Sequence, residues 1–183
     1  MHIDLVRDAS KTFPKQANRD AVRSAKIWYC KYKSIAPLAD MTGLTELVIA
    51  GLPDDNLSFL SGLVNLRYLS ILHMPRISDL AALSKLIQLE SLSLATSPAW
   101  DAAQKCLTVA SIDPISEIYG LKHIELFGVC PPTKRLQALL DLEKLETGRF
   151  SQYPDSEVAI FYQKTGAQRE FNPKPAFEIK ELA

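Results

Sequence analysis

The 183-residue sequence predicts an α/β solenoid, in which short strands and compact return turns alternate along one stack of units. Two observations predict this fold. An apolar triplet with spacings of three and then two residues recurs along the chain, and apolar residues at every third position precede each later triplet. The stretch from Ile77 to Leu94, ISDLAALSKLIQLESLSL, shows both spacings in order. One unit is therefore a short strand, a loop and a tight return path.

The strand of each unit is marked by the last two residues of its triplet. Apolar residues two apart point to the same face of a strand, so Leu92 and Leu94 both point into a core. A sixth, partial unit begins at Leu145 and continues through Gly148 and Phe150. The five complete triplets are Val22-Ala25-Ile27, Leu44-Leu47-Ile49, Leu66-Leu69-Ile71, Leu89-Leu92-Leu94 and Leu121-Ile124-Leu126.

The return path of each unit is marked by apolar residues three apart, which line one side of a tight turn or a short 3₁₀ segment. A bundle of amphipathic helices is the competing interpretation, but it requires apolar residues at i, i+3, i+4 and i+7, which the repeat does not supply. No unit buries its leucines alone, so the units stack and share one parallel sheet. The spaced sets are Ile35-Leu38-Met41, Leu57-Leu60-Leu63, Leu80-Leu83-Leu86, Ile112-Ile115-Ile118 and Leu136-Leu139-Leu142.

The runs of Leu-x-x-Leu-x-Leu with preceding Leu/Ile triplets resemble leucine-rich repeat proteins. Units start at residues 22, 44, 66, 89, 121 and 145, so successive starts lie 22, 22, 23, 32 and 24 residues apart. The shorter spacings resemble the subclass found in internalin-like proteins and phosphatase regulatory subunits, over roughly residues 22–150. The resemblance implies an arc with short parallel strands on its concave face and 3₁₀ or short helical turns on its convex face. It is unspecific for function.

One feature of the family is largely missing. The family places asparagine or cysteine three residues after the last strand leucine, and only Cys30 fits that position well here. The turns must therefore satisfy their backbone groups in another way, and we expect irregular loops.

The two ends of the stack are expected to carry caps. Residues 1–21 are assigned to an N-terminal cap, 22–153 to the solenoid, and 154–183 to a C-terminal helical cap and tail. The segment Pro154–Gly166, PDSEVAIFYQKTG, predicts a helix with Asp155 or Ser156 at its start and Gly166 at its end.

The last residues, REFNPKPAFEIKELA, contain two prolines and many charges. We expect this tail to be ordered only if Phe171 and Phe177 dock on the rest of the chain.

The fourth unit carries an insertion at about residues 96–111, which contains Trp100 and predicts a helical turn at Asp101–Leu107. Two interpretations of Trp100 stay open. In one, the insertion is a surface excursion whose Trp100 packs back on the core. In the other, it overhangs a binding face and offers Trp100 to a partner, since loops on rigid scaffolds often carry recognition.

Outward-facing strand residues are expected to form three lanes across the concave face, with equivalent positions about 4.8 Å apart. The lanes are Ser24, Glu46, Tyr68, Ser91, His123 and Thr147; then Lys26, Val48, Ser70, Ser93, Glu125 and Arg149; then Trp28, Ala50, Leu72, Ala95, Phe127 and Ser151. Exposed aromatic residues beside an arginine are typical of protein-binding hot spots. The alternative is that scattered apolar surface residues have no binding role and that Glu125 and Arg149 simply pair. We assign partner binding to Trp28, Tyr68, Leu72, Trp100, His123, Glu125, Phe127 and Arg149.

Composition and motifs argue against other function classes. Lysine plus arginine equals aspartate plus glutamate, 21 of each, so no global field favours nucleic acid or a membrane surface. Three cysteines without a CxxC pair argue against a disulfide framework and a zinc site. No GxSxG, HExxH, Walker loop or GxGxxG occurs, so we expect no catalytic residues, no cofactor and no metal.

These observations predict a non-catalytic protein-protein interaction module, of an inhibitor, immunity or regulatory type, that binds a protein through its concave sheet and the insertion. No signal peptide or membrane span is evident, so we expect a cytoplasmic protein, more often a monomer than an obligate oligomer. One alternative is a hydrolase or transferase that uses a cleft beside His123 and Glu125, and another is an exported effector or adhesin.

Overall fold

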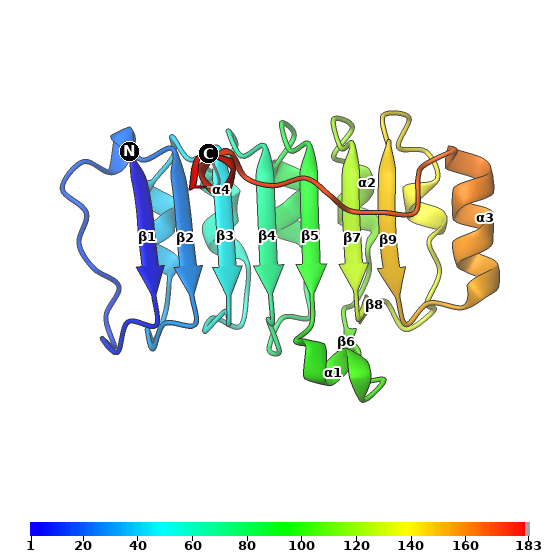
Figure 1. Cartoon of the computed structure of the whole chain (residues 1–183), viewed down its shortest axis with the longest axis horizontal. Coiled ribbons are helices and arrows are strands. Elements are labelled where there is room, and N and C mark those ends of the chain that lie inside the picture. Colours follow the sequence, from blue (N-terminus) through cyan, green and yellow to red (C-terminus); the bar gives the residue numbers. More distant parts are fainter. Residues whose placement is uncertain (182–183) are drawn as a thin grey trace.

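A parallel sheet of seven five-residue strands runs along the molecule (Figure 1). The computed structural model describes residues 1–181. Neighbouring strands pair in parallel in the order β1-β2-β3-β4-β5-β7-β9. The strands are β1 (His2–Val6), β2 (Ser24–Trp28), β3 (Glu46–Ala50), β4 (Tyr68–Leu72), β5 (Ser91–Ala95), β7 (His123–Phe127) and β9 (Thr147–Ser151). The predicted α/β solenoid is confirmed.

Short turns cover the other face of the sheet, behind the strands in Figure 1. Leu38, Leu60 and Leu83, each the middle residue of a set spaced by three, have no exposed surface. The expected 3₁₀ return path is therefore confirmed, because residues three apart lie on one side of such a helix. The segments are η1 (Arg19–Ala21), η2 (Ala36–Asp40), η3 (Ser58–Gly62), η4 (Ala81–Lys85), α2 (Asp113–Ser116) and η5 (Gln137–Leu139).

The core fills the space between the sheet and these turns. In each inner strand the second and fourth residues point inward, as Leu69 and Ile71 do in β4, and both are fully buried. Burying an aliphatic side chain of this size contributes about 1.5–3 kcal/mol. The stack of such pairs is what joins one unit to the next.

Within residues 1–21, the segment His2–Val6 adds a strand to the sheet. It pairs with β2 from His2↔Ser24 to Val6↔Trp28, and Ile3 and Leu5 take the inward positions. The three-then-two spacing does not mark this strand, because only the period of two, Ile3 to Leu5, is present.

A residue with a left-handed backbone directly follows six of the seven strands of the main sheet. These residues are Arg7, Tyr29, Gly51, His73, Gly128 and Gln152, with φ between 50° and 75°. The left-handed conformation turns the chain away from the sheet at the same point of each unit. The turns are thus more regular than the missing asparagine pattern led us to expect.

The insertion leaves the sheet after β5. It forms α1 (Pro98–Ala102) and β6 (Leu107–Thr108), and β6 pairs with β8 (Val129–Cys130). The helical turn predicted at Asp101–Leu107 is wrong in its bounds. Pro98 lies at the first turn, where its missing N–H costs nothing, so the helix begins there and ends at Ala102.

The far end of the stack is closed by α3 (Asp155–Thr165), which confirms the predicted helix. Gly166 ends it with φ 71°, while Asp155 lies within the first turn instead of capping it. Phe161 of α3 is fully buried. Beyond α3 the chain returns across the front of the sheet and ends in α4 (Ala176–Glu181), beside β2 and β3 in Figure 1. Residues 182–183 of the assigned C-terminal tail lie outside the described residues.

We expected an ordered tail only if Phe171 and Phe177 dock on the rest of the chain. Phe177 is buried and Phe171 is half-buried, which agrees with an ordered tail up to residue 181. None of the helices in residues 1–181 combines the length and the apolar character that crossing a bilayer needs.

Candidate binding surface

The strand register defines three lanes on the concave face, each with one residue per strand. Because β1 belongs to the sheet, each lane has one member more than the sequence predicts. The first lane is His2, Ser24, Glu46, Tyr68, Ser91, His123 and Thr147. The second lane is Asp4, Lys26, Val48, Ser70, Ser93, Glu125 and Arg149. The third lane is Val6, Trp28, Ala50, Leu72, Ala95, Phe127 and Ser151.

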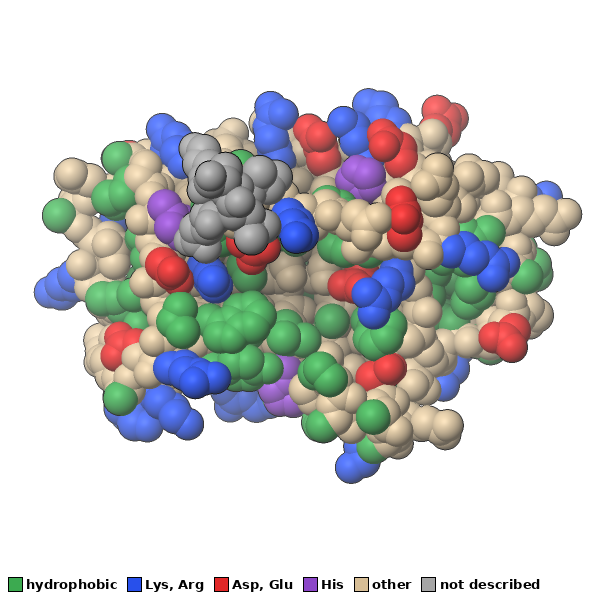
Figure 2. All heavy atoms as spheres, viewed as in Figure 1, with side chains coloured by type: hydrophobic (Ala, Val, Ile, Leu, Met, Phe, Trp, Pro, Cys, Tyr) green, Lys and Arg blue, Asp and Glu red, His purple; other side chains and the backbone are tan. Residues whose placement is uncertain are grey.

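The third lane is apolar across six consecutive strands, from Val6 to Phe127. Val6 is 50% exposed, and Trp28 and Leu72 are half-buried. Apolar side chains gather on the lower part of this face in Figure 2. The stripe is partly exposed, with the fully buried Ala50 in its floor, and an apolar stripe of this kind marks an interaction surface more often than isolated residues do.

The inserted helix α1 lies at the carboxyl ends of β5 and β7, along the lower edge of the sheet in Figure 1. The carboxylate of Asp101 accepts hydrogen bonds from Ser151 Oγ at 2.8 Å and Gln152 Nε2 at 3.2 Å. The Trp100 ring meets the His73 ring edge-on, with centroids 5.5 Å apart. These contacts attach the insertion to the turns after β4 and β9.

A cavity of about 390 Å³ lies between α1 and the strands. It brings together four of the residues assigned from sequence, Leu72, Glu125, Phe127 and Arg149, and it excludes Trp100. Its other lining residues are Ala95, Thr96, Pro98, Asp101 and Ala102. The insertion thus lines one side of the cavity with its helix, while its tryptophan packs on His73.

A polar cluster closes one side of this cavity. Arg149 Nη1 lies 3.3 Å from Glu125 Oε1, and the guanidinium carbon lies 4.3 Å from the centre of the Phe127 ring. Ser93 Oγ donates to Glu125 Oε2 at 2.5 Å. The Glu125 side chain is 12% exposed and Arg149 is 49% exposed. The carboxylate is therefore occupied by the protein, whereas the arginine presents unused N–H groups to solvent.

His123 does not contact Glu125 among the described residues. A hydrogen bond of 2.9 Å joins His123 Nδ1 and Thr147 Oγ1, and His123 Nε2 lies 4.0 Å from Glu146 Oε2. The cavity includes Glu125 and leaves His123 outside. His123 and Glu125 therefore lie on one face but have different neighbours. Residues 1–181 also contain no group of three or more potential ligands placed to hold a metal.

Tyr68 lies beneath the returning C-terminal chain. Its hydroxyl donates to the Pro173 carbonyl at 3.4 Å. Burial, followed by the negative charges of Glu178, Glu125 and Glu46, raises the pKa of Tyr68 to about 12. Tyr68 is therefore separated from the open third lane. In that lane, the centroid of the Trp28 ring lies 5.9 Å from Lys26 Nζ.

The assigned residues thus do not share one environment. Leu72, Glu125, Phe127 and Arg149 share the cavity, Trp28 extends the apolar stripe, and Tyr68 lies under the tail, while His123 and Trp100 contact other neighbours. Sequence reasoning missed Val6 and Asp101. The alternation of Ile3 and Leu5 indicates the strand that places Val6, but nothing local to Asp101 indicates its bonds fifty residues along the chain.

No protein-family model and no curated protein matches this chain. Among solved structures, an internalin (inlF) from Listeria monocytogenes aligns with a TM-score of 0.58 and 20% identity, over 80% of this chain and 40% of that one. An internalin C2 (inlC2) from the same species aligns with a TM-score of 0.52 and 16% identity, over 81% of this chain and 71% of that one. Our chain spans well under half of the first internalin. At these identities the likeness concerns the fold, which is that of a leucine-rich repeat protein.

Proposed function

We propose that this leucine-rich repeat protein is a non-catalytic interaction module that binds a protein through its third lane and the cavity under α1. One observation carries the proposal: six apolar residues in register end at a cavity that the insertion lines on one side. Stacked strands hold these side chains in fixed positions, so little conformational entropy is lost on association.

The chemistry of the cavity suggests how a partner is held. Leu72 and Phe127 offer apolar walls, and Arg149 offers N–H groups at the rim. An apolar anchor of the partner would fill the cavity, while a carboxylate or carbonyl beside it would accept from Arg149. A buried anchor ringed by polar contacts is the arrangement that concentrates binding energy in other interfaces.

An inhibitor, an immunity-type protein and a regulatory subunit would all use such a surface, because each acts by covering a partner. The insertion supports this class of role, since Trp100 and Asp101 attach α1 to neighbouring turns beside the cavity. Loss or change of the partner's own activity on binding would distinguish inhibition from scaffolding.

The test compares two double variants in quantitative capture from an extract of the native host. Trp28→Ser with Leu72→Ser removes two anchors of the third lane. Ile87→Ser with Tyr119→Ser removes two large apolar side chains, 65% and 74% exposed, in the turns that precede β5 and β7. We expect the partner to be lost at least about tenfold from the first variant, because hot-spot residues contribute about 2 kcal/mol or more each.

The control variant should retain the partner at the wild-type level. Circular dichroism and a cooperative thermal transition establish that both variants are folded. Equal capture by folded forms of both variants would show that the third lane is not the binding surface.

A further inference from the structure

The C-terminal arm, residues 168–178, crosses the concave face from the last strand to the first. It starts at the sheet edge, where Gln168 N donates to Glu146 O and Gly148 N donates to Gln168 O, both within 2.9 Å. It ends at β1, where the Phe177 ring stacks on the His2 ring with centroids 4.4 Å apart. Figure 1 shows its path in front of β9, β7, β5 and β4. The arm therefore lies over the first lane.

The arm is extended as far as Pro175 and helical from Ala176, where α4 begins, and its burial alternates along both parts. Its residues Phe171, Pro173, Pro175 and Phe177 are buried or half-buried, while Asn172, Lys174 and Ala176 between them are exposed. A period of two is what an extended chain shows when one side of it rests on a surface. The inward side reads aromatic-x-Pro-x-Pro-x-aromatic.

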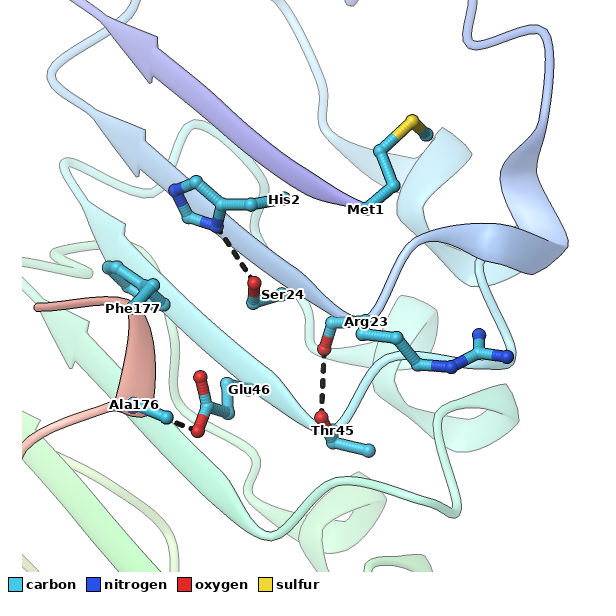
Figure 3. A pocket seen from close by; sticks show the side chains of 8 residues that line it. All are labelled: Met1, His2, Arg23, Ser24, Thr45, Glu46, Ala176 and Phe177. Atoms are coloured by element: carbon cyan, nitrogen blue, oxygen red, sulfur yellow. Dashed lines mark hydrogen bonds between the residues drawn. The ribbon is translucent and has the colours of Figure 1, made fainter. Parts of the chain in front are cut away.

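The first lane supplies a complementary groove for this pattern. His2 stacks on Phe177, the Tyr68 hydroxyl donates to Pro173 O, and Glu46 Oε1 accepts from Ala176 N at 2.9 Å. Figure 3 shows Glu46 of β3 and His2 of β1 pointing toward the arm, with Ser24 of the intervening β2 bonded to His2 at 2.8 Å. A cavity of about 460 Å³ remains beside Phe177. Aromatic rings beside hydrogen-bonding side chains are how proteins bind extended proline-containing segments.

The arm is held mainly by side chains. Between Arg169 and Pro175, a single hydrogen bond joins the arm to the sheet within the described residues, and that bond is the long one from Tyr68. Pro173 and Pro175 have no N–H to satisfy, so their part of the arm leaves few backbone donors unpaired when it docks or undocks. Phe177 is buried but lies outside the contiguous core. Such contacts form without folding the core and break without unfolding it.

We infer that the first lane is a peptide-binding groove for a protein segment with the pattern aromatic-x-Pro-x-Pro-x-aromatic, extended up to its second proline, and that the C-terminal arm is its intramolecular occupant. A partner protein with such a segment binds there by displacing the arm. This groove is separate from the third lane and the cavity under α1, so the inference goes beyond the proposed function and does not rest on it.

The test measures binding of a labelled peptide with the sequence of residues 168–178, QREFNPKPAFE, by fluorescence anisotropy. The full-length variant Phe171→Ser with Phe177→Ser has an arm without its anchors, and it should bind the peptide. Wild type should bind the same peptide about tenfold more weakly or worse, because its tethered arm competes at an effective concentration on the order of mM.

Two controls isolate the docking pattern. The variant Asn172→Ser with Lys174→Ser changes exposed arm positions and should resist the peptide as wild type does. A peptide with serine at both aromatic positions should bind no form of the protein. Should the double aromatic variant fail to fold, Phe177→Ala alone removes only the His2 stack and carries the same measurement.

Two results would overturn the inference. One is a folded arm variant that binds the peptide no better than wild type does. The other is a wild-type dimer in sedimentation that the arm variant abolishes, since the arm would then be exchanged between copies instead of occupying its own groove.

Discussion

Six of the seven strands in the main sheet are followed directly by a residue with a left-handed backbone, which makes the turn away from the sheet. Gly51 and Gly128 take the left-handed conformation without strain, but Tyr29 and His73 take it despite the cost of about 1–2 kcal/mol for a residue with a Cβ. The sequence indicates the two glycines as turn positions. It does not indicate the others, because their strain is accepted only once the stacked strands fix the turn.

Gly128 has a second reason to lack a side chain. A Cβ there would lie 2.3 Å from Thr96 Oγ1, whereas a Cβ at Gly166, which has a similar φ, would meet nothing within 4 Å. We expect Gly166→Ala to lower the free energy of unfolding by roughly 1–2 kcal/mol for backbone strain alone. Gly128→Ala should lower it by about 1–3 kcal/mol more, because overpacking adds to the strain.

Urea denaturation of the two glycine variants measures this difference. Equal losses at the two positions would mean that Thr96 moves aside and that the close contact imposes no constraint.

At the scale of elements, the sequence predicts where the insertion lies along the chain but not where it packs in the fold. The spacing of 32 residues identifies its position, and Pro98 explains in retrospect where its helix begins. Its attachment to Ser151 and Gln152 depends on which way the loop folds over the sheet edge. That direction follows from packing between units, which a one-dimensional pattern does not contain.

The attachment of α1 predicts a local effect of one carboxylate. Asp101→Ala should lower the free energy of unfolding by at most about 3 kcal/mol, since a hydrogen bond to a charged group contributes about 1.5–3 kcal/mol. Its larger effect should be faster hydrogen exchange confined to residues 98–108, with the strands unchanged. Asp113→Ala is the matched control, because Asp113 is also acidic and lies in the first turn of a short helix, α2.

Hydrogen exchange by mass spectrometry distinguishes the two aspartate variants. Faster exchange in both, or in neither, would show that Asp101 does not hold the insertion in place.

At the scale of the whole molecule, most of the fold was predictable and the state of its concave face was not. Repeated spacing determines the strands, their order and the inward residues such as Leu69, because each follows from the period of the pattern. The cover over Tyr68 was not predictable, since the sequence leaves open whether Phe171 and Phe177 dock. The division of the face into a covered first lane and an open third lane is therefore a result of the structure.

Three buried groups predict how the whole molecule responds to alkali. Burial raises the pKa of Tyr68 to about 12 and of Cys130 to about 12, and it also raises the pKa of Tyr153. In an unfolded chain tyrosine and cysteine titrate at about 10 and 8.5. The unfolded chain thus loses protons first, so the free energy of unfolding is fully present below about pH 8 and falls as the pH rises toward 12.

Urea midpoints measured from about pH 8 to 11 test the sign of this effect. Cys130→Ala should reduce the decline between about pH 8.5 and 10, where the thiols of the unfolded chain ionise before its tyrosines do. A midpoint that stays constant or rises with pH would contradict the burial of these groups.

The C-terminal arm also alters how the stack comes apart. In an ordinary solenoid each repeat contacts only its neighbours, so the terminal repeats fray first and independently of each other. Here Gln168 is bonded beside the last strand and Phe177 rests on the first, so one short segment links both extremities of the array like a belt. Melting of β1 releases the arm, and release of the arm exposes the face of β9. Disorder at the first strand is thereby transmitted to a segment attached at the last strand, while the core between them stays folded.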